Sequence, residues 1–184
     1  ETVAGGLTGK LEGTSFTDSL LVGHSTTGTL SGDAIQNTGV GIAALDALTS
    51  GDYNTAVGFG SGSSLTSGSH NTMLGNRAGV SITSATNNVA IGSKALETDS
   101  SSGMDNVAVG YNSLNAVTSG DNNIGIGTDA GDSITSSRNN IMIGMDAGQN
   151  LVDGSGNIII GTVDTAATDS ARTLKITSYD GSTT

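Results

Sequence analysis

The stretch Asn106-Val-Ala-Val-Gly110 is one copy of a five-residue motif that recurs along most of the chain. The first position is Asn in eight of nine copies, the fifth is Gly in all nine, and the three between them are mostly apolar. Successive copies lie 17 or 18 residues apart and begin at residues 19, 37, 54, 71, 88, 106, 123, 140 and 157. A short period that persists across most of a chain predicts a repeat architecture rather than one globular core.

Each repeat carries a second apolar position, eleven residues after its start. This position is occupied by Leu30, Leu48, Leu65, Ile82, Val117, Ile134 and Leu151. The fifth copy has Asp99 there instead, and an extra residue in its 98–103 loop. A polar turn such as Thr118-Ser-Gly-Asp121 closes the unit. One β-branched strand and one weaker apolar strand in 17 residues predict a single turn of a β-solenoid, because helical repeats are about twice as long.

The sequence therefore predicts an all-β parallel solenoid (a β-roll) of about nine coils over residues 19–161. The recurring Asn suits a ladder of side-chain amides that bond from coil to coil. Residues 1–18 are expected to form an N-terminal joining segment. Residues 162–184 are expected to form a C-terminal capping segment, because 172–179 alternate as a strand does and an open sheet edge needs cover.

The main strand is apolar on both of its faces, which is unusual for a strand with one side in water. Positions two and four are expected to fill the coil. We expect the position-four residues to form the coil core: Val22, Val40, Val57, Leu74, Ile91, Val109, Ile126, Ile143 and Ile160. Position three is then expected to form an interface between copies of the chain, with these candidates: Leu21, Ala56, Met73, Ala90, Ala108, Met142 and Ile159. The alternative is a thicker monomeric solenoid that covers position three itself.

Composition narrows the functional classes. The chain has 184 residues, with 29 Gly, no Pro, Cys or Trp, and a formal net charge of −11. That charge has the wrong sign for binding phosphates or an anionic membrane surface, so no nucleic acid partner is expected. The absence of Cys excludes disulfides and thiolate metal sites. No basic segment leads into an apolar stretch at the start, and no run reaches about 20 apolar residues, so no membrane insertion is expected.

Residues with catalytic chemistry are sparse. His24 and His70 have no recurring carboxylate or Ser partner, so neither is assigned a catalytic role. Asp129 and Asp146 fall at equivalent positions one repeat apart, a spacing that a calcium site or a retaining glycosidase would share. A repeated solvated turn position explains them more economically. We therefore expect no enzyme activity, no cofactor and no metal site.

Exposed aromatic side chains are the usual platforms for sugars. Phe59 and Tyr111 both follow a repeat glycine directly, and they are the candidate glycan contacts. The alternative is that they pack over neighbouring turns.

The repeat resembles two known groups. The strings Asn54-Thr-Ala-Val-Gly-Phe59 and Asn106-Val-Ala-Val-Gly-Tyr-Asn-Ser-Leu114, each followed by a Thr-Ser-Gly turn, are similar to the phage tail-fibre and tail-spike repeat that precedes an endosialidase-type intramolecular chaperone. The head repeat of trimeric autotransporter adhesins is also similar, although its period is usually shorter. The resemblance covers residues 19–161. It implies left-handed parallel coils in an intertwined or side-by-side homotrimer, with position three near the threefold axis.

These features together favour a structural or receptor-binding segment of a trimeric phage tail fibre that mediates attachment to a host cell surface. The expected location is the virion or the cell exterior, and the expected partners are further fibre or virion components and a host glycan or protein. Three alternatives stay open. They are a bacterial adhesin head, an ice-binding solenoid suggested by recurring Thr, and a fibre-borne polysaccharide depolymerase.

Overall fold

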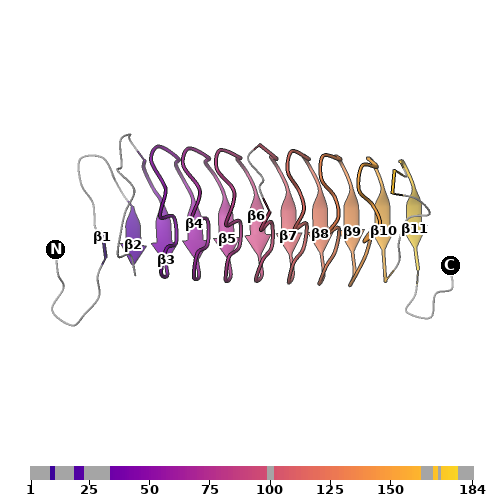
Figure 1. Ribbon diagram of the computed structural model, residues 1–184, viewed down its shortest axis with the longest axis horizontal. Helices are drawn as coiled ribbons and strands as arrows, with labels where there is room; N and C mark the ends of the chain where they lie inside the picture. Colours follow the sequence, from indigo (N-terminus) through magenta and orange to yellow (C-terminus); the bar gives the residue numbers. More distant parts are fainter. Residues whose placement is uncertain are drawn as a thin grey trace.

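A computed structural model describes residues 9–10, 19–22, 34–98, 102–162, 168–169 and 171–177. Within these ranges the chain winds into a row of coils, each of which contributes one short strand to a single sheet (Figure 1). The strands are β1 (Gly9–Lys10), β2 (Leu20–Val22), β3 (Thr38–Val40), β4 (Thr55–Val57), β5 (Thr72–Leu74), β6 (Val89–Ile91), β7 (Val107–Val109), β8 (Ile124–Ile126), β9 (Ile141–Ile143), β10 (Ile158–Ile160) and β11 (Leu174–Ile176).

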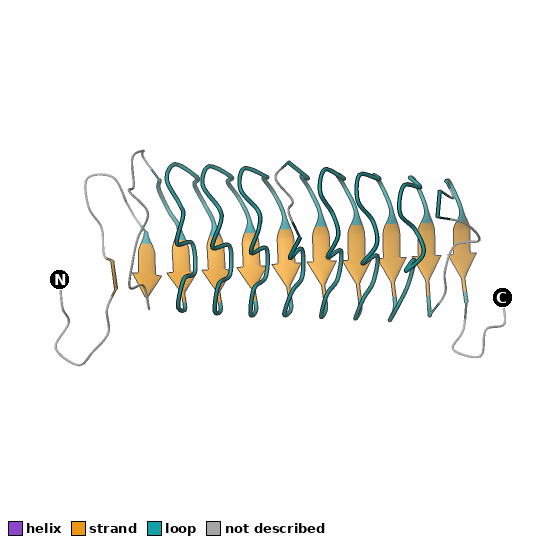
Figure 2. Cartoon of the chain, in the orientation of Figure 1, coloured by secondary structure: helices purple, strands orange, loops and turns teal. Residues whose placement is uncertain are grey.

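The sheet follows the order of the sequence from β1 to β11. Strands β2 to β11 pair in parallel with their neighbours, whereas β1 pairs antiparallel with β2. Equivalent repeat positions face each other, so that Thr38 pairs with Thr55 and Thr55 with Thr72. The described part contains strands and loops but no helix (Figure 2). The predicted all-β solenoid is confirmed, and its coils coincide with the 17-residue repeat.

The two ends of the chain are described only in part. From residues 1–18, the expected joining segment, the structure describes β1 alone. The strand expected within residues 172–179 is confirmed as β11, which pairs with β10. Asp99 and His24 lie outside the described residues.

The weaker second strand predicted for each repeat is not a strand. The segment after β3 turns instead, with Ala43 and Leu45 both in the left-handed region at φ 58° and 56°. Left-handed residues at alternate positions prevent an extended chain. The segment still bonds from coil to coil: Leu45 N–H donates to Ser61 O at 3.1 Å and Ala47 N–H donates to Ser63 O at 3.1 Å.

The core is a column of side chains enclosed by each coil. Position three of every main strand points into it, and the second apolar position lies in it as well. These residues are buried, with 0–1 % of their surface exposed: Leu21, Ala56, Met73, Ala90, Ala108, Met142, Ile159, Leu48, Leu65, Ile82, Val117, Ile134 and Leu151. The core contains no aromatic side chain among the described residues.

The predicted assignment of the two strand faces is therefore wrong. The candidate interface residues at position three fill the coil, so they cannot contact another copy of the chain. The candidate coil-core residues at position four point outward. Val40, Val57, Ile91 and Ile126 are 36–40 % exposed, and Val22, Leu74, Val109, Ile143 and Ile160 are half-buried. The physical reason is the alternation of a strand, which places position three on the same side as the buried Asn at position one.

Neighbouring coils compensate for one another in side-chain size. A Cβ at Gly62 would lie 2.8 Å from Met73 Cε, and one at Gly79 would lie 2.9 Å from Met73 Sδ. The long Met73 side chain thus occupies the space that two glycines leave. At Gly125, position three is itself a glycine. Leu114 fills the space beside it, and its Cγ would lie 2.8 Å from a Cβ added at Gly125. Dense packing is reached because a large residue on one element meets a small one on the next.

Candidate functional site

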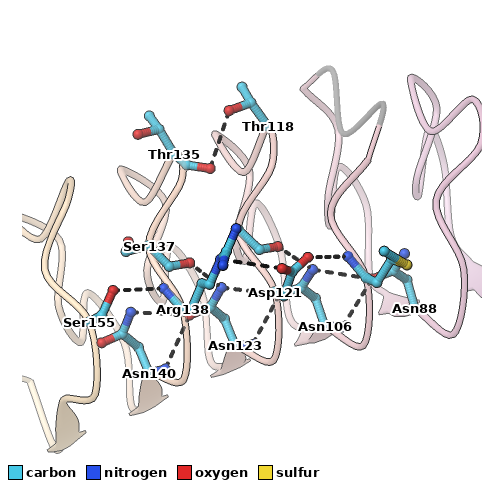
Figure 3. Close-up of polar contacts among 12 residues, drawn as sticks. Asn88, Asn106, Thr118, Asp121, Asn123, Thr135, Ser137, Arg138, Asn140 and Ser155 are labelled. Atoms are coloured by element: carbon cyan, nitrogen blue, oxygen red, sulfur yellow. Dashed lines mark hydrogen bonds and ion pairs between the residues drawn. The ribbon is translucent and has the colours of Figure 1, made fainter.

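The Asn at position one forms a continuous buried ladder that fixes the orientation of the main strand. In each step the side-chain oxygen of one coil accepts bonds from the next: Asn54 N–H and Asn54 Nδ2 both donate to Asn37 Oδ1, at 2.9 and 3.0 Å. Asn54 Nδ2 also donates to Gly68 O at 2.9 Å. Figure 3 shows four further members of the ladder, Asn88, Asn106, Asn123 and Asn140, with these bonds. The predicted amide ladder is confirmed.

The ladder is completed at both ends by other groups. Ser19 replaces Asn in the first coil, and its Oγ accepts a 2.8 Å bond from Asn37 N–H. In the last coil, Thr173 N–H donates to Asn157 Oδ1 at 2.9 Å. The ladder thereby satisfies its buried amides without water, as polar groups in a core require.

Positions two and four of β3 to β10 form one flat outward surface, which we call the outer sheet face. It consists of Thr38, Val40, Thr55, Val57, Thr72, Leu74, Val89, Ile91, Val107, Val109, Ile124, Ile126, Ile141, Ile143, Ile158 and Ile160. None of these residues is ionisable, although the chain has a net charge of −11. All are half-buried or exposed. A continuous apolar surface of this kind is typical of an interaction site.

Exposed apolar side chains also follow the repeat glycine at the end of the strand. Phe59 is 55 % exposed and Tyr111 is 50 % exposed, and Ile42 and Met145 occupy the equivalent place in other coils. The two predicted glycan contacts are accessible and lie three coils apart. Their role stays a prediction.

Sequence reasoning missed an aromatic pair at the other end of the strand. The rings of Tyr53 and His70 stack, with centroids 4.8 Å apart and planes 8° apart. Both residues directly precede a ladder Asn, and their separation is one repeat, which is the signal that could have revealed the pair. His70 thus has an aromatic neighbour in the adjacent coil.

The acidic residues considered for a cation or for hydrolysis lie on the turns. Asp129 Oδ1 accepts a 2.7 Å bond from Asn112 Nδ2 in the preceding coil. Across the described residues, no group of three or more His, Asp or Glu side chains is arranged to hold a metal ion. An ion pair joins Arg138 Nε to Asp121 Oδ2 at 3.3 Å and bridges two coils (Figure 3).

The recurring Thr residues of the far turn use their hydroxyl protons within the fold. Thr49 Oγ1 donates to Thr66 O at 2.9 Å, and Thr66 Oγ1 donates to Thr83 O at 3.1 Å. Thr118 Oγ1 bonds to Thr135 O in the same way at 3.2 Å (Figure 3). These hydroxyl protons therefore point toward the next coil, whereas the ice-binding alternative would need them to face water.

None of the described segments is a helix long and apolar enough to cross a membrane. Comparison of the chain with protein-family models, with curated proteins and with solved structures found no match. The described part of the chain is a parallel β-solenoid with an uncharged outer sheet face.

Proposed function

We propose that this chain is a structural, receptor-binding segment of a homotrimeric fibre, such as a phage tail fibre, which attaches to a host cell surface. The observation that supports the proposal is the outer sheet face. It presents Val, Ile, Leu and Thr over eight consecutive coils and carries no charge. A segment with this surface needs a partner, because contiguous apolar area exposed to water is unfavourable.

Charge and repetition support a second and third copy of the chain as that partner. Two chains with a net charge of −11 repel each other over most of their surfaces, and an uncharged face is where they can approach. The cores of interfaces are depleted of charged residues in the same way. The face also repeats at the strand spacing of about 4.8 Å, so that a second copy in register meets equivalent side chains along the whole rod.

The dimensions fit side-by-side packing of rods. Eight strands at about 4.8 Å give a face roughly 35–40 Å long. Such a contact is long and narrow. Closed cyclic symmetry allows three identical faces to meet in this way. The resemblance of the repeat to trimeric fibres favours three.

The mass in solution tests the assembly. Light scattering of the purified protein is expected to give three times the 18.0 kDa of one chain at micromolar concentration. A stable single chain would contradict the proposal, and so would a dimer. Attachment is tested separately with fluorescently labelled protein on a panel of intact bacteria. Labelling of none of them would contradict the receptor-binding half of the proposal and leave the structural half in place.

A further inference from the structure

One exposed residue per coil precedes the buried ladder Asn and forms a row along the rod, which we call the ridge. Its members are Gln36, Tyr53, His70, Asn87, Asp105, Asn122 and Asn139. Each has a left-handed backbone, with φ between 57° and 61°. Backbone bonds hold the row in place: Tyr53 N–H donates to Ile35 O at 3.1 Å and His70 N–H donates to Asp52 O at 2.9 Å. The ridge is therefore a rigid part of the solenoid.

Most polar side-chain groups of the ridge have no hydrogen-bond partner within the described part of the chain. Neither the amides of Gln36, Asn87, Asn122 and Asn139 nor the His70 imidazole makes a hydrogen bond to any residue that the structure describes. Each amide offers two donors and an acceptor, and an imidazole offers further sites. As far as the structure describes the chain, the ridge thus presents hydrogen-bonding groups without partners at the regular spacing of the coils.

Backbone geometry explains most of the ridge but not Gln36 or Tyr53. Asn, Asp and His are enriched in the left-handed region, so their presence here needs no further cause. Tyr is not, and a bulky residue in this conformation is destabilised by about 1 kcal/mol. Asn fills the same place in three other coils at no such cost. Leu45, Leu96 and Leu114 share this conformation, so the exposure of the Tyr53 ring, rather than its backbone, is what points to binding.

Tyr53 and His70 form a stacked aromatic pair with an amide residue in the coil on either side. Their rings stack at 4.8 Å, Tyr53 is 47 % exposed, and His70 is exposed as well. The parallel register places Gln36 one coil before the pair and Asn87 one coil after it. The four residues give apolar ring surface in the middle, with a phenol, an imidazole and two amides around it.

We propose that Gln36, Tyr53, His70 and Asn87 bind an uncharged oligosaccharide. Sugars combine apolar C–H surfaces with many hydroxyls, and this site combines aromatic carbon with unpaired donors and acceptors. Asp105 is the single acidic residue of the ridge, and the net charge of −11 repels polyanionic glycans, which favours neutral ones. Neutral glycans would then be the ligands of the attachment function proposed above, and the biological role of this site rests on that function.

The test replaces both rings by the residue that other coils use. The double variant Tyr53→Asn, His70→Asn retains a side chain that the left-handed backbone accepts, so the fold is expected to be preserved. Binding is measured by biolayer interferometry against immobilised dextran, mannan, galactan and laminarin, with polygalacturonate as an anionic polymer. We expect the native protein to bind at least one neutral polymer in preference to polygalacturonate, and the double variant to bind it at least tenfold more weakly.

A matched control is Met145→Asn. Met145 is 52 % exposed but follows the repeat glycine, where Asn76 stands in another coil, so this replacement is expected to leave binding unchanged. Failure of every neutral polymer to bind overturns the proposal, as does equal binding by the double variant or a loss of binding in Met145→Asn instead. The mass of the double variant is measured in parallel. A changed mass would show that the pair is an assembly contact, and it would overturn the glycan site. A native protein that binds glycan as a single chain would overturn only the proposed trimeric fibre.

Discussion

The side-chain nitrogen of Asn71 lies 3.0 Å from the side-chain oxygen of Asn54, one coil earlier, with both residues buried. The same nitrogen donates to Ala85 O at 2.9 Å, and Asn71 Oδ1 accepts from Asn88 N–H at 3.0 Å. Every polar atom of this side chain therefore has a partner in its own coil or in an adjacent one. The ladder couples the coils to one another along the axis.

Replacement of Asn71 by Ala is expected to destabilise the solenoid by about 3 kcal/mol. The change leaves the buried Asn88 N–H and Ala85 O without partners, and each unsatisfied buried group costs about 1–3 kcal/mol. Chemical denaturation followed by circular dichroism measures the effect. The matched control is Asn87→Gly, which removes an exposed, unbonded side chain and suits the left-handed backbone, so a change below about 1 kcal/mol is expected. Equal losses in the two variants would show that the ladder adds no stability.

Replacement of Gly75 by Ala is expected to cost about 3 kcal/mol or to abolish folding. An added Cβ would lie 2.5 Å from Gly92 O, and φ is +141°, a region that residues with a side chain rarely adopt. Gly60→Ala provides the comparison, because the nearest atom to its added Cβ is Arg77 Cγ at 3.8 Å and Ala43 already fills the equivalent place in another coil. A loss of about 1 kcal/mol is expected there. Thermal melts of the two variants should differ clearly, and coincident melts would contradict the close approach of the coils.

Adjacent residues of β9 test which strand face is buried. Met142 is fully buried, so Met142→Ala is expected to lower stability by about 2–5 kcal/mol at every protein concentration. Ile143 lies on the outer sheet face, so Ile143→Ala is expected to leave the stability of an isolated chain within about 1 kcal/mol of native. Its effect should instead grow on dilution, because it weakens association. The reverse pattern would restore the assignment of faces that the sequence alone suggested.

A charge on the outer sheet face is expected to dissociate the assembly without unfolding the chain. Ile126→Lys places an ammonium group where the packed copies would exclude water, which costs several kcal/mol per copy. The mass by light scattering should fall to that of one chain while the circular dichroism spectrum is retained. Ser136→Lys adds the same charge at an exposed turn on the far side of the coil and is expected to leave the mass unchanged. An unchanged mass in both variants would place the contact elsewhere.

Much of this fold is predictable from the repeat. The position of the strand, the Asn ladder and the strand near the C-terminus all follow from the spacing of Asn and Gly and from local alternation. The two faces were not assigned correctly, because the main strand is apolar on both of them. Gly and Ala at position three make room for Leu side chains of adjacent turns, such as Leu114 beside Gly125, and that pairing requires three-dimensional contacts. Strand alternation assigns the faces correctly, because Gly39 lies two residues after the buried Asn37 and therefore on the same side of the strand.

The Tyr53–His70 pair was missed for a different reason. Strand and turn patterns treat residues between elements as connectors, and the left-handed conformation before each ladder Asn leaves no apolar signature in the sequence. Only the register, which places residues 17 apart beside each other, shows that two isolated rings meet.

The fit of Met73 between Gly62 and Gly79 restricts how such a rod can change its length. Coils of this chain are not interchangeable modules, since each one is shaped to the volume of the coils before and after it. Excision of residues 74–90, one repeat length, would put Leu96 in the place of Gly79 and bring it against Met73, so that two bulky side chains would compete for one space. Lengthening or shortening by recombination should therefore succeed at junctions where the incoming and outgoing core residues have equal bulk, and fail by steric conflict or by an internal void elsewhere.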